Sequence, residues 1–188
     1  MAAILIDKPT TQVNNYGTGG IFSQTGLSTP IVNTTSELTL IDGGVGTLSV
    51  PANGFNVGDT FWAYMGGQIF ANNGDTLRIK IKTAAGLILA DTGLISMRNA
   101  TAKPFTIDFK FSIWQIGGAG TATLLTGGLF QYLENASDKF DSIPSGSLNN
   151  TTFNTTIPNT LDITAQWGTA SLTNSIQTSI FVLTKIYG

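Results

Sequence analysis

Histidine and cysteine are both absent from this sequence of 188 residues. The missing cysteines exclude disulfide bonds and thiolate metal sites, so the redox compartment cannot be inferred. Without either residue type, Ser–His–Asp triads, thiol nucleophiles and histidine-based zinc sites are excluded as well. Paired carboxylates are the main catalytic arrangement that remains, and no motif indicates a metal or an organic cofactor.

Charge is also scarce, since charged residues make up 11% of the chain against roughly 25% in ordinary soluble domains. The surface must therefore be built largely from Thr, Ser, Asn and Gly. Because mixed charge normally keeps monomers apart, this composition favours a self-associating protein. The net charge of −2 and the lack of a basic run argue against a nucleic-acid partner.

Long apolar runs are missing too, and no stretch approaches the roughly 18 residues of a transmembrane helix, so no membrane association is expected. The opening residues MAAILIDKPTT hold too few apolar residues for a secretory signal. Residues 1–20 lack periodicity and end in GTGG, so we expect an N-terminal arm that attaches a domain of residues 21–188 to something larger. A frayed terminus is the alternative. The candidate anchor residues are Ile4, Leu5 and Ile6.

What the chain does contain is alternation, which is strongest in residues 104–116, PFTIDFKFSIWQI. A period of two residues is typical of a β-strand with one buried and one solvent-facing side. At helical spacing the same apolar residues would scatter around the cylinder and bury nothing together. We therefore predict that this strand organises the core. Its buried residues are predicted to be Phe105, Ile107, Phe109, Phe111 and Ile113.

Further strands with the same period are predicted at residues 76–84 and 161–167, and a third at residues 31–40. The run NNGD at residues 72–75 is the strongest hairpin turn in the chain. The cations Arg78, Lys80 and Lys82 alternate with aliphatic residues, which predicts a solvated strand face more readily than a site for an acidic partner. About 8–10 antiparallel strands without a convincing helix predict an all-β fold, a jelly-roll sandwich.

Irregular positions are predicted at two pairs of glycines, because glycine in a strand often marks a bulge or a break. These pairs are Gly66–Gly67 and Gly127–Gly128. A long polar connection is predicted at residues 135–150. Acidic residues near it could bind Ca²⁺, but their spacing fits no EF-hand and a lysine lies among them, so no metal site is predicted. They are Glu134, Asp138 and Asp141, with Lys139 between.

The last strand, within residues 174–187, carries apolar residues on both faces. A strand that is apolar on both faces is expected to be buried on both, for example between the core and a neighbouring subunit. Simple alternation assigns Ile176, Ile180 and Val182 to one face and the remaining apolar residues to the other. The candidate subunit-interface residues are therefore Ile176, Ile180, Phe181, Val182, Leu183 and Tyr187.

The C-terminal run FNTTIPNTLDITAQWGTASLTNSIQTSIFVLTKIY, residues 153–187, resembles a recurrent segment of virion structural proteins from tailed phages and large DNA viruses. In those proteins the segment closes a TNF- or C1q-like jelly roll. Looser similarity extends the resemblance over about residues 25–188, and LDITAQWG is its most specific piece. The resemblance implies a trimeric jelly roll displayed on a fibre, tail or capsid surface. It implies no catalytic residue, and no ligand site in the individual loop at residues 135–150.

These observations predict a viral structural protein and not an enzyme: a trimeric jelly-roll component of the virion surface, either a capsid decoration or minor capsid protein or a tail-associated one. Its expected partners are other copies of itself and virion proteins such as major capsid or tail proteins. The alternative is the receptor- or glycan-binding head of a fibre, in which Trp114 or Tyr132 stacks on a host surface glycan. A second alternative is a glycosidase that uses Asp108 and Asp162, although carboxylates on wet sheet faces seldom have the raised pKa that acid catalysis needs.

Overall fold

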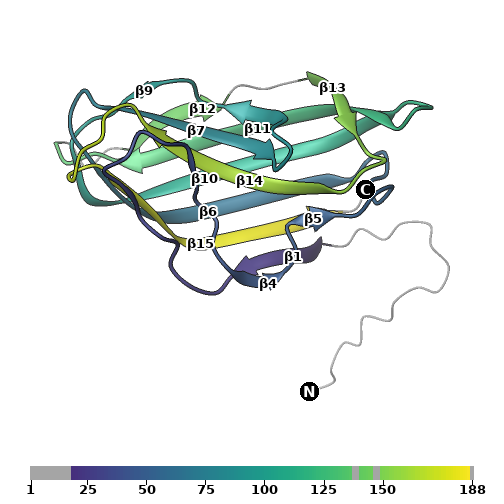
Figure 1. Ribbon diagram of the computed structural model, residues 1–188, viewed down its shortest axis with the longest axis horizontal. Coiled ribbons are helices and arrows are strands. Elements are labelled where there is room, and N and C mark those ends of the chain that lie inside the picture. The colour runs from purple at the N-terminus through teal and green to yellow at the C-terminus, as the bar shows by residue number, and fades with distance from the viewer. Residues whose placement is uncertain (1–17, 137–139, 146–148, 187–188) are drawn as a thin grey trace, which may run out of the picture.

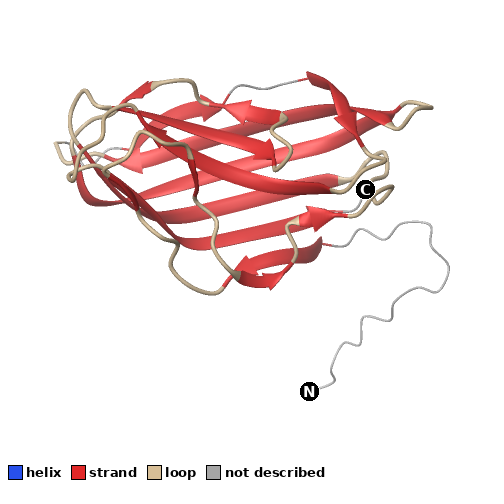
Figure 2. Cartoon of the chain, in the orientation of Figure 1, coloured by secondary structure: helices blue, strands red, loops and turns tan. Residues whose placement is uncertain are grey.

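The structure is a computed structural model that describes the backbone of residues 18–136, 140–145 and 149–186, and side chains within residues 20–136 and 152–186. These parts of the chain form strands and turns, without a helix (Figure 2). It follows that no membrane-spanning helix occurs among the described residues. The strands are β1 (Thr18–Gln24), β2 (Ile31–Val32), β3 (Leu38–Thr39), β4 (Gly44–Gly46), β5 (Ser49–Val50), β6 (Thr60–Ala71), β7 (Thr76–Thr83), β8 (Ile88–Asp91), β9 (Ile95–Ser96), β10 (Ala100–Ile116), β11 (Thr121–Leu133), β12 (Phe140–Ser145), β13 (Asn149–Asn154), β14 (Asn159–Trp167) and β15 (Ser175–Ile186).

Two antiparallel sheets pack face to face (Figure 1). The nine-stranded sheet, called the large sheet below, has the order β12-β11-β10-β6-β15-β1-β4, with β13 also paired to β11 and β2 to β15. The six-stranded small sheet has the order β3-β14-β7-β8, with β5 paired to β14 and β9 to β7. The predicted all-β, jelly-roll-like sandwich is confirmed. Nine of the strands in the described residues have six residues or more, and the others are short edge pieces.

The centre of the large sheet is β10, which pairs with β11 on one side and β6 on the other. The alternation predicted for residues 104–116 holds, because Phe105, Ile107, Phe109 and Ile113 are at most 1% exposed and Phe111 is 6% exposed. Phe61 of β6 stacks on Phe111 with ring centroids 4.7 Å apart. Each such buried aromatic contributes on the order of 2–3 kcal/mol through the area it removes from water.

The small sheet covers this core with the inner faces of β7 and β14. The alternation predicted for both strands is confirmed, since Leu77, Ile79 and Ile81 of β7 and Leu161, Ile163, Ala165 and Trp167 of β14 are buried. The Trp167 indole N–H donates a hydrogen bond of 3.0 Å to the carbonyl of Ile31 in the large sheet. This bond joins the two layers and satisfies a polar group that burial would otherwise leave without a partner.

Residues 31–40 do not form the single strand that was predicted. β2 pairs with β15 in the large sheet, whereas β3 pairs with β14 in the small sheet, so the chain crosses between the layers here. The crossing begins at Asn33, whose φ of 51° lies in the left-handed region that asparagine tolerates better than most residues. The predicted strand is therefore interrupted at a backbone conformation that the sequence pattern does not reveal.

The two glycine pairs lie inside continuous strands, so the predicted breaks are wrong, although a bulge does lie opposite Gly66–Gly67. β6 runs unbroken through Gly66–Gly67, and the irregularity lies in its partner β15, between Thr178 and Ile180. β11 likewise runs through Gly127–Gly128. The predicted connection at residues 135–150 contains the strand β12, which pairs with β11. Residues 1–17 of the predicted arm lie outside the described residues, and Thr18–Gly20 pairs with β15.

Candidate functional site

The outer face of the large sheet carries aromatic and aliphatic side chains that this chain itself leaves exposed. Trp62 and Tyr64 point outward from β6, because they alternate with the buried Phe61, Ala63 and Met65. Val182 of β15 lies directly beside Tyr64 in the register, and Ile180 lies beside Gly66. Trp62 is 36% exposed and Ile180 is 56% exposed. Trp62, Tyr64, Ile180 and Val182 are called the apolar band below.

The charges next to the apolar band are neutralised within the subunit. On the neighbouring strand β10, the Lys110 ammonium lies 2.7 Å from the Asp108 carboxylate. The same carboxylate accepts a hydrogen bond of 3.1 Å from the Trp62 indole, and the Lys110 Nζ lies 5.1 Å from the centre of the Trp62 ring. The Trp62 side chain is thereby held in one orientation, with a cation–π contact of the kind that aromatic rings make at exposed sites.

The bulge in β15 decides which candidate interface residues reach this face. Because one extra residue is inserted between Thr178 and Ile180, Ile176 shares the core face with Phe181 and Leu183, and all three are at most 2% exposed. The assignment of Ile176 to the face of Ile180 and Val182 is therefore wrong. Among the candidates, Ile180 and Val182 are left on the outer face. Tyr187 and the candidate anchor residues Ile4, Leu5 and Ile6 lie outside the described residues.

Two aromatic residues were candidates for stacking on a sugar. Tyr132 is fully buried, with its hydroxyl accepting a hydrogen bond of 2.9 Å from the backbone N–H of Arg98 and its ring stacked 5.8 Å from that of Phe130. It is a core residue, so its assignment to an exposed site is wrong. Trp114 is 62% exposed, at the irregularity of β10 between Ile113 and Gln115.

The two candidate catalytic carboxylates lie on opposite outer faces of the sandwich. Asp108 points outward from the large sheet, between buried residues of β10. Asp162 points outward from the small sheet, between buried residues of β14, and accepts a hydrogen bond of 2.7 Å from the Thr39 hydroxyl. Glycosidases need their two carboxyl groups within about 5–10 Å across one cleft, and the core separates these two. This pair cannot act on one substrate.

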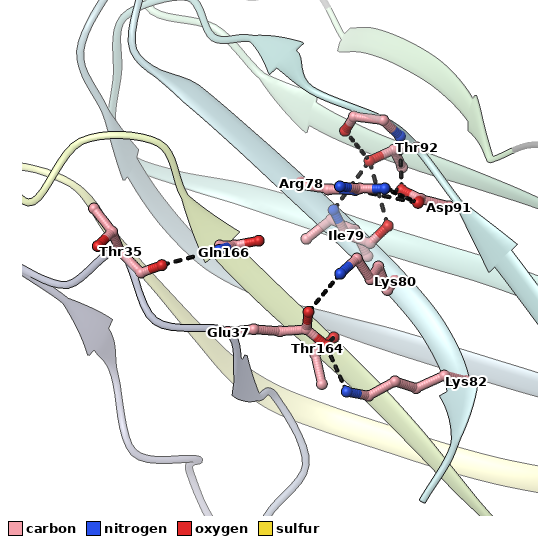
Figure 3. A network of polar contacts seen from close by, with 11 residues as sticks. Thr35, Glu37, Arg78, Ile79, Lys80, Lys82, Asp91, Thr92, Thr164 and Gln166 are labelled. Atoms are coloured by element: carbon pink, nitrogen blue, oxygen red, sulfur yellow. Dashed lines mark hydrogen bonds and ion pairs between the residues drawn. The ribbon is translucent and has the colours of Figure 1, made fainter. Parts of the chain in front are cut away.

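The cationic strand β7 is neutralised by acids that the sequence pattern did not pair with it (Figure 3). Glu37, from the crossing between the sheets, forms ion pairs with Lys80 and Lys82 and accepts a hydrogen bond of 2.9 Å from Thr164. The hydrogen bonds from Lys80 and then Lys82 lower the pKa of Glu37 from 4.5 to about 2, against the opposing effect of burial. These contacts fix residues of the crossing onto the outer face of the small sheet.

The third cation of this strand, Arg78, holds the carboxylate of Asp91 on β8, with its Nε 2.9 Å and 3.1 Å from the two oxygens. This contact lowers the pKa of Asp91 and raises the pKa of Arg78. All three cations therefore have a carboxylate partner within the chain. A solvated face was predicted, whereas the Lys80 and Lys82 side chains are only 17% and 23% exposed and lie against Glu37 of the crossing.

Acidic clusters that could hold a metal ion do not occur among the described residues. Asp138 and the Asp141 side chain lie outside them, so Glu134 is the described member of the acidic group that was weighed as a Ca²⁺ site. The candidate functional features are therefore the apolar band, the exposed Trp114 and two hollows, one lined by Phe70 and the other by Gln68 of β6.

The molecule thus belongs to the class of antiparallel β-sandwich proteins with an exposed aromatic sheet face. No protein-family model matches the chain, and no curated protein is similar to it in sequence. Among solved structures, it is similar to the CBM2 module of an evolved Dit from Lactobacillus casei BL23 phage J-1. That similarity covers 74% of this chain and 68% of the other, with 12% sequence identity and a TM-score of 0.31, values too low to indicate function.

Proposed function

We propose that this protein is a structural component of a virus particle, in which copies of the chain associate as a homotrimer through the outer face of the large sheet. In this proposal the trimer lies on the virion surface, as a capsid decoration, minor capsid or tail-associated protein, and contacts major capsid or tail proteins. The observation that carries the proposal is the apolar band on β6 and β15. The resemblance of residues 153–187 to virion structural proteins supports the viral setting.

The chemistry of the apolar band suits association between copies. Aromatic residues are enriched and charged residues depleted at the centres of protein interfaces, and here Trp62, Tyr64, Ile180 and Val182 form a continuous patch on adjacent strands. Burying such a patch stabilises the complex by roughly 25 cal/mol per Å² of apolar area. This gain must exceed the free-energy cost of the rotational and translational freedom that the subunits lose. The Asp108–Lys110 pair is already neutralised within one subunit, so the contact needs no ion pair between subunits.

A charge placed within the apolar band tests this proposal. Ile180→Glu puts an unpaired carboxylate where the interface would bury it, and it is expected to convert trimers into monomers. The matched control is Ile157→Glu, which changes a similarly exposed isoleucine, 44% exposed, in the turn before β14. Light scattering behind a sizing column measures both masses. Monomers from Ile157→Glu and trimers from Ile180→Glu would contradict the assignment of the interface.

Attachment to the particle is assigned to residues 1–20, with Ile4, Leu5 and Ile6 as the anchor. Deleting residues 1–17, which leaves Thr18–Gly20 of β1 in place beside β15, is expected to abolish incorporation into particles while leaving the trimer intact. Incorporation is measured by blotting purified particles from cells that produce the deleted form. A deleted protein that incorporates normally, or one that becomes monomeric, would refute this division of roles.

The exposed Trp114 favours a second candidate function, the receptor- or glycan-binding head of a fibre. An indole that is 62% exposed offers a flat apolar face on which a sugar ring can stack. A glycan array with the wild-type protein and Trp114→Ala tests it: binding that disappears in the variant supports this candidate, and binding that persists refutes the role of Trp114.

A further inference from the structure

A cleft of about 640 Å³ opens on the outer face of the large sheet, near the ends of β6 and β10. Phe70 lines it from β6, on the same outward-facing side as Trp62 and Tyr64. Phe70 lies four residues along β6 from Gly66, the partner of Ile180, which places the cleft roughly 13 Å from the nearer end of the apolar band at about 3.3 Å per residue. No residue of the apolar band lines the cleft, so it is a separate feature.

The shape of the cleft comes from an irregularity in β10. Ala100 pairs with Ala71 and Lys103 with Ile69, so the pairing skips one residue on β10, and Ala102 there has a φ of 54°. A bulge of this kind bends a strand and redirects its side chains, and bulges are common next to binding sites. The volume falls within the roughly 300–1,000 Å³ of typical small-molecule sites.

The lining combines apolar surface with neutral hydrogen-bonding groups. Phe70, Val32 and Leu172 supply the apolar part. The polar lining residues are Asn72, Asn99, Thr101, Asn135, Thr173 and Ser175. Among the residues that the structure describes, none that lines the cleft is ionisable, which favours an uncharged ligand.

Hydrogen bonds within the chain hold these polar groups in place. The Asn135 side chain accepts a hydrogen bond of 3.0 Å from the Thr101 backbone N–H and donates one of 2.9 Å to the Thr101 hydroxyl oxygen. The Thr101 hydroxyl can therefore still donate its own proton to a ligand. The side-chain Oδ1 of Asn99 accepts a hydrogen bond of 2.8 Å from the Asn73 backbone N–H, which fixes the orientation of the Asn99 side-chain amide. Side chains fixed before binding lose little freedom when a ligand arrives.

We propose that this cleft binds a neutral saccharide. A pyranose ring has a face of C–H groups and a rim of hydroxyls, which matches an aromatic ring beside fixed amides and hydroxyls. In the proposed complex the C–H face lies on Phe70, and the hydroxyls exchange hydrogen bonds with Asn99, Thr101 and Asn135. A second hollow of about 410 Å³ on the same face, lined in part by Gln68 and Gln177, extends the site for a longer oligosaccharide. This inference does not rest on Trp114, and the second hollow borders the apolar band, because Ser179 lines it next to Ile180.

The test uses the full chain and a panel of neutral probes: glucose, galactose, N-acetylglucosamine, maltose, lactose and chitobiose, with N-acetylneuraminic acid as the charged comparison. Saturation-transfer NMR identifies bound sugars, and titration calorimetry gives the affinity. We expect at least one neutral sugar to bind, Phe70→Ala to weaken it about tenfold or more, and Thr101→Val to weaken it several-fold. Leu94→Ala, which removes a side chain that is 70% exposed and does not line the cleft, is the control and should leave the affinity unchanged. Trp114→Ala distinguishes this site from the second candidate function.

Three results would overturn the proposal: no neutral sugar binds, only the charged sugar binds, or Trp114→Ala abolishes binding that Phe70→Ala leaves intact. Thermal unfolding of each variant checks that it is folded. Thr101→Val keeps the shape of the side chain and serves as the decisive variant if Phe70→Ala does not fold. The mass of every sample is measured in parallel, so a failure to bind sugar is distinguished from a failure to form trimers.

Discussion

Replacing Glu37 with glutamine removes the charge that ties the crossing between the sheets to β7. The ion pairs with Lys80 and Lys82 lower the folded-state pKa of Glu37 from 4.5 to about 2, and that difference corresponds to at most about 3.4 kcal/mol of stability. The three side chains are 22%, 17% and 23% exposed, so water screens the pairs and the expected loss is about 1–2 kcal/mol at pH 7.

The pH dependence of this loss identifies its cause. Because the pKa of Glu37 is depressed in the folded state, its contribution is complete above the unfolded-state pKa of 4.5 and disappears as the pH falls toward 2. The wild type and Glu37→Gln should therefore differ at pH 7 and converge at about pH 2. Urea unfolding followed by tryptophan fluorescence measures the difference at pH 7, 4 and 2.5.

The matched control is Asp42→Asn, an acid-to-amide change whose exposed carboxylate accepts a bond from the Gly43 backbone N–H. It should change stability by less than about 0.5 kcal/mol. If the loss of unfolding free energy in Glu37→Gln stays constant from pH 7 to pH 2.5, the electrostatic reasoning is refuted, because a loss of packing does not depend on pH.

Three further predictions concern the free energy of unfolding, measured in urea. Gly67→Ala should cost about 2 kcal/mol or more, because the new Cβ would lie 2.0 Å from the Gln177 carbonyl oxygen. The control is Gly66→Ala, whose Cβ meets nothing closer than 3.6 Å and should be tolerated. Equal losses of stability in the two variants would contradict this reasoning. Thr178→Val should be neutral or stabilise by about 1 kcal/mol, since the buried hydroxyl has no hydrogen-bond partner, and a clear loss would reveal one. Trp167→Phe should cost about 2–4 kcal/mol, because it leaves a cavity and removes the hydrogen bond to the Ile31 carbonyl. A loss under 1 kcal/mol would contradict the role of Trp167 in joining the two sheets.

Alternation predicted the core well because burial on one side of a sheet imposes a period of two. The inward residues of β7, β10 and β14 follow from their sequences without knowledge of their neighbours. This holds even for β10, whose pairing is irregular near both ends. The class of fold could therefore be predicted from a few strands.

Single backbone deviations were beyond the reach of periodicity. The positive φ at Asn33 separates β2 from β3 and carries the chain between sheets, although residues 31–40 read as one strand. The bulge in β15 moves Ile176 to the core, although a strict count of two places it outside. Both deviations depend on how distant strands pair, which a local pattern does not contain.

The candidate site was predicted only in part for the same reason. Ile180 and Val182 were recognised as apolar residues of a two-faced strand, but Trp62 was not connected to them because β6 and β15 are more than 100 residues apart. Tyr132 was misassigned although it alternates with the buried Phe130, and its hydroxyl accepts a hydrogen bond from the Arg98 backbone N–H inside the protein. Asn72, Asn99 and Asn135, which follow three different strands or loops, were the available signal for the cleft, and only the fold brings them together.

Sedimentation equilibrium of the full chain at low and high salt is the most direct test of the proposed association. If copies join through apolar surface without ion pairs between them, the mass should be three times 19.8 kDa in both conditions, because salt screens charges and leaves apolar contacts intact. A mass of one chain at every concentration, or a trimer that dissociates as salt rises, would contradict the account.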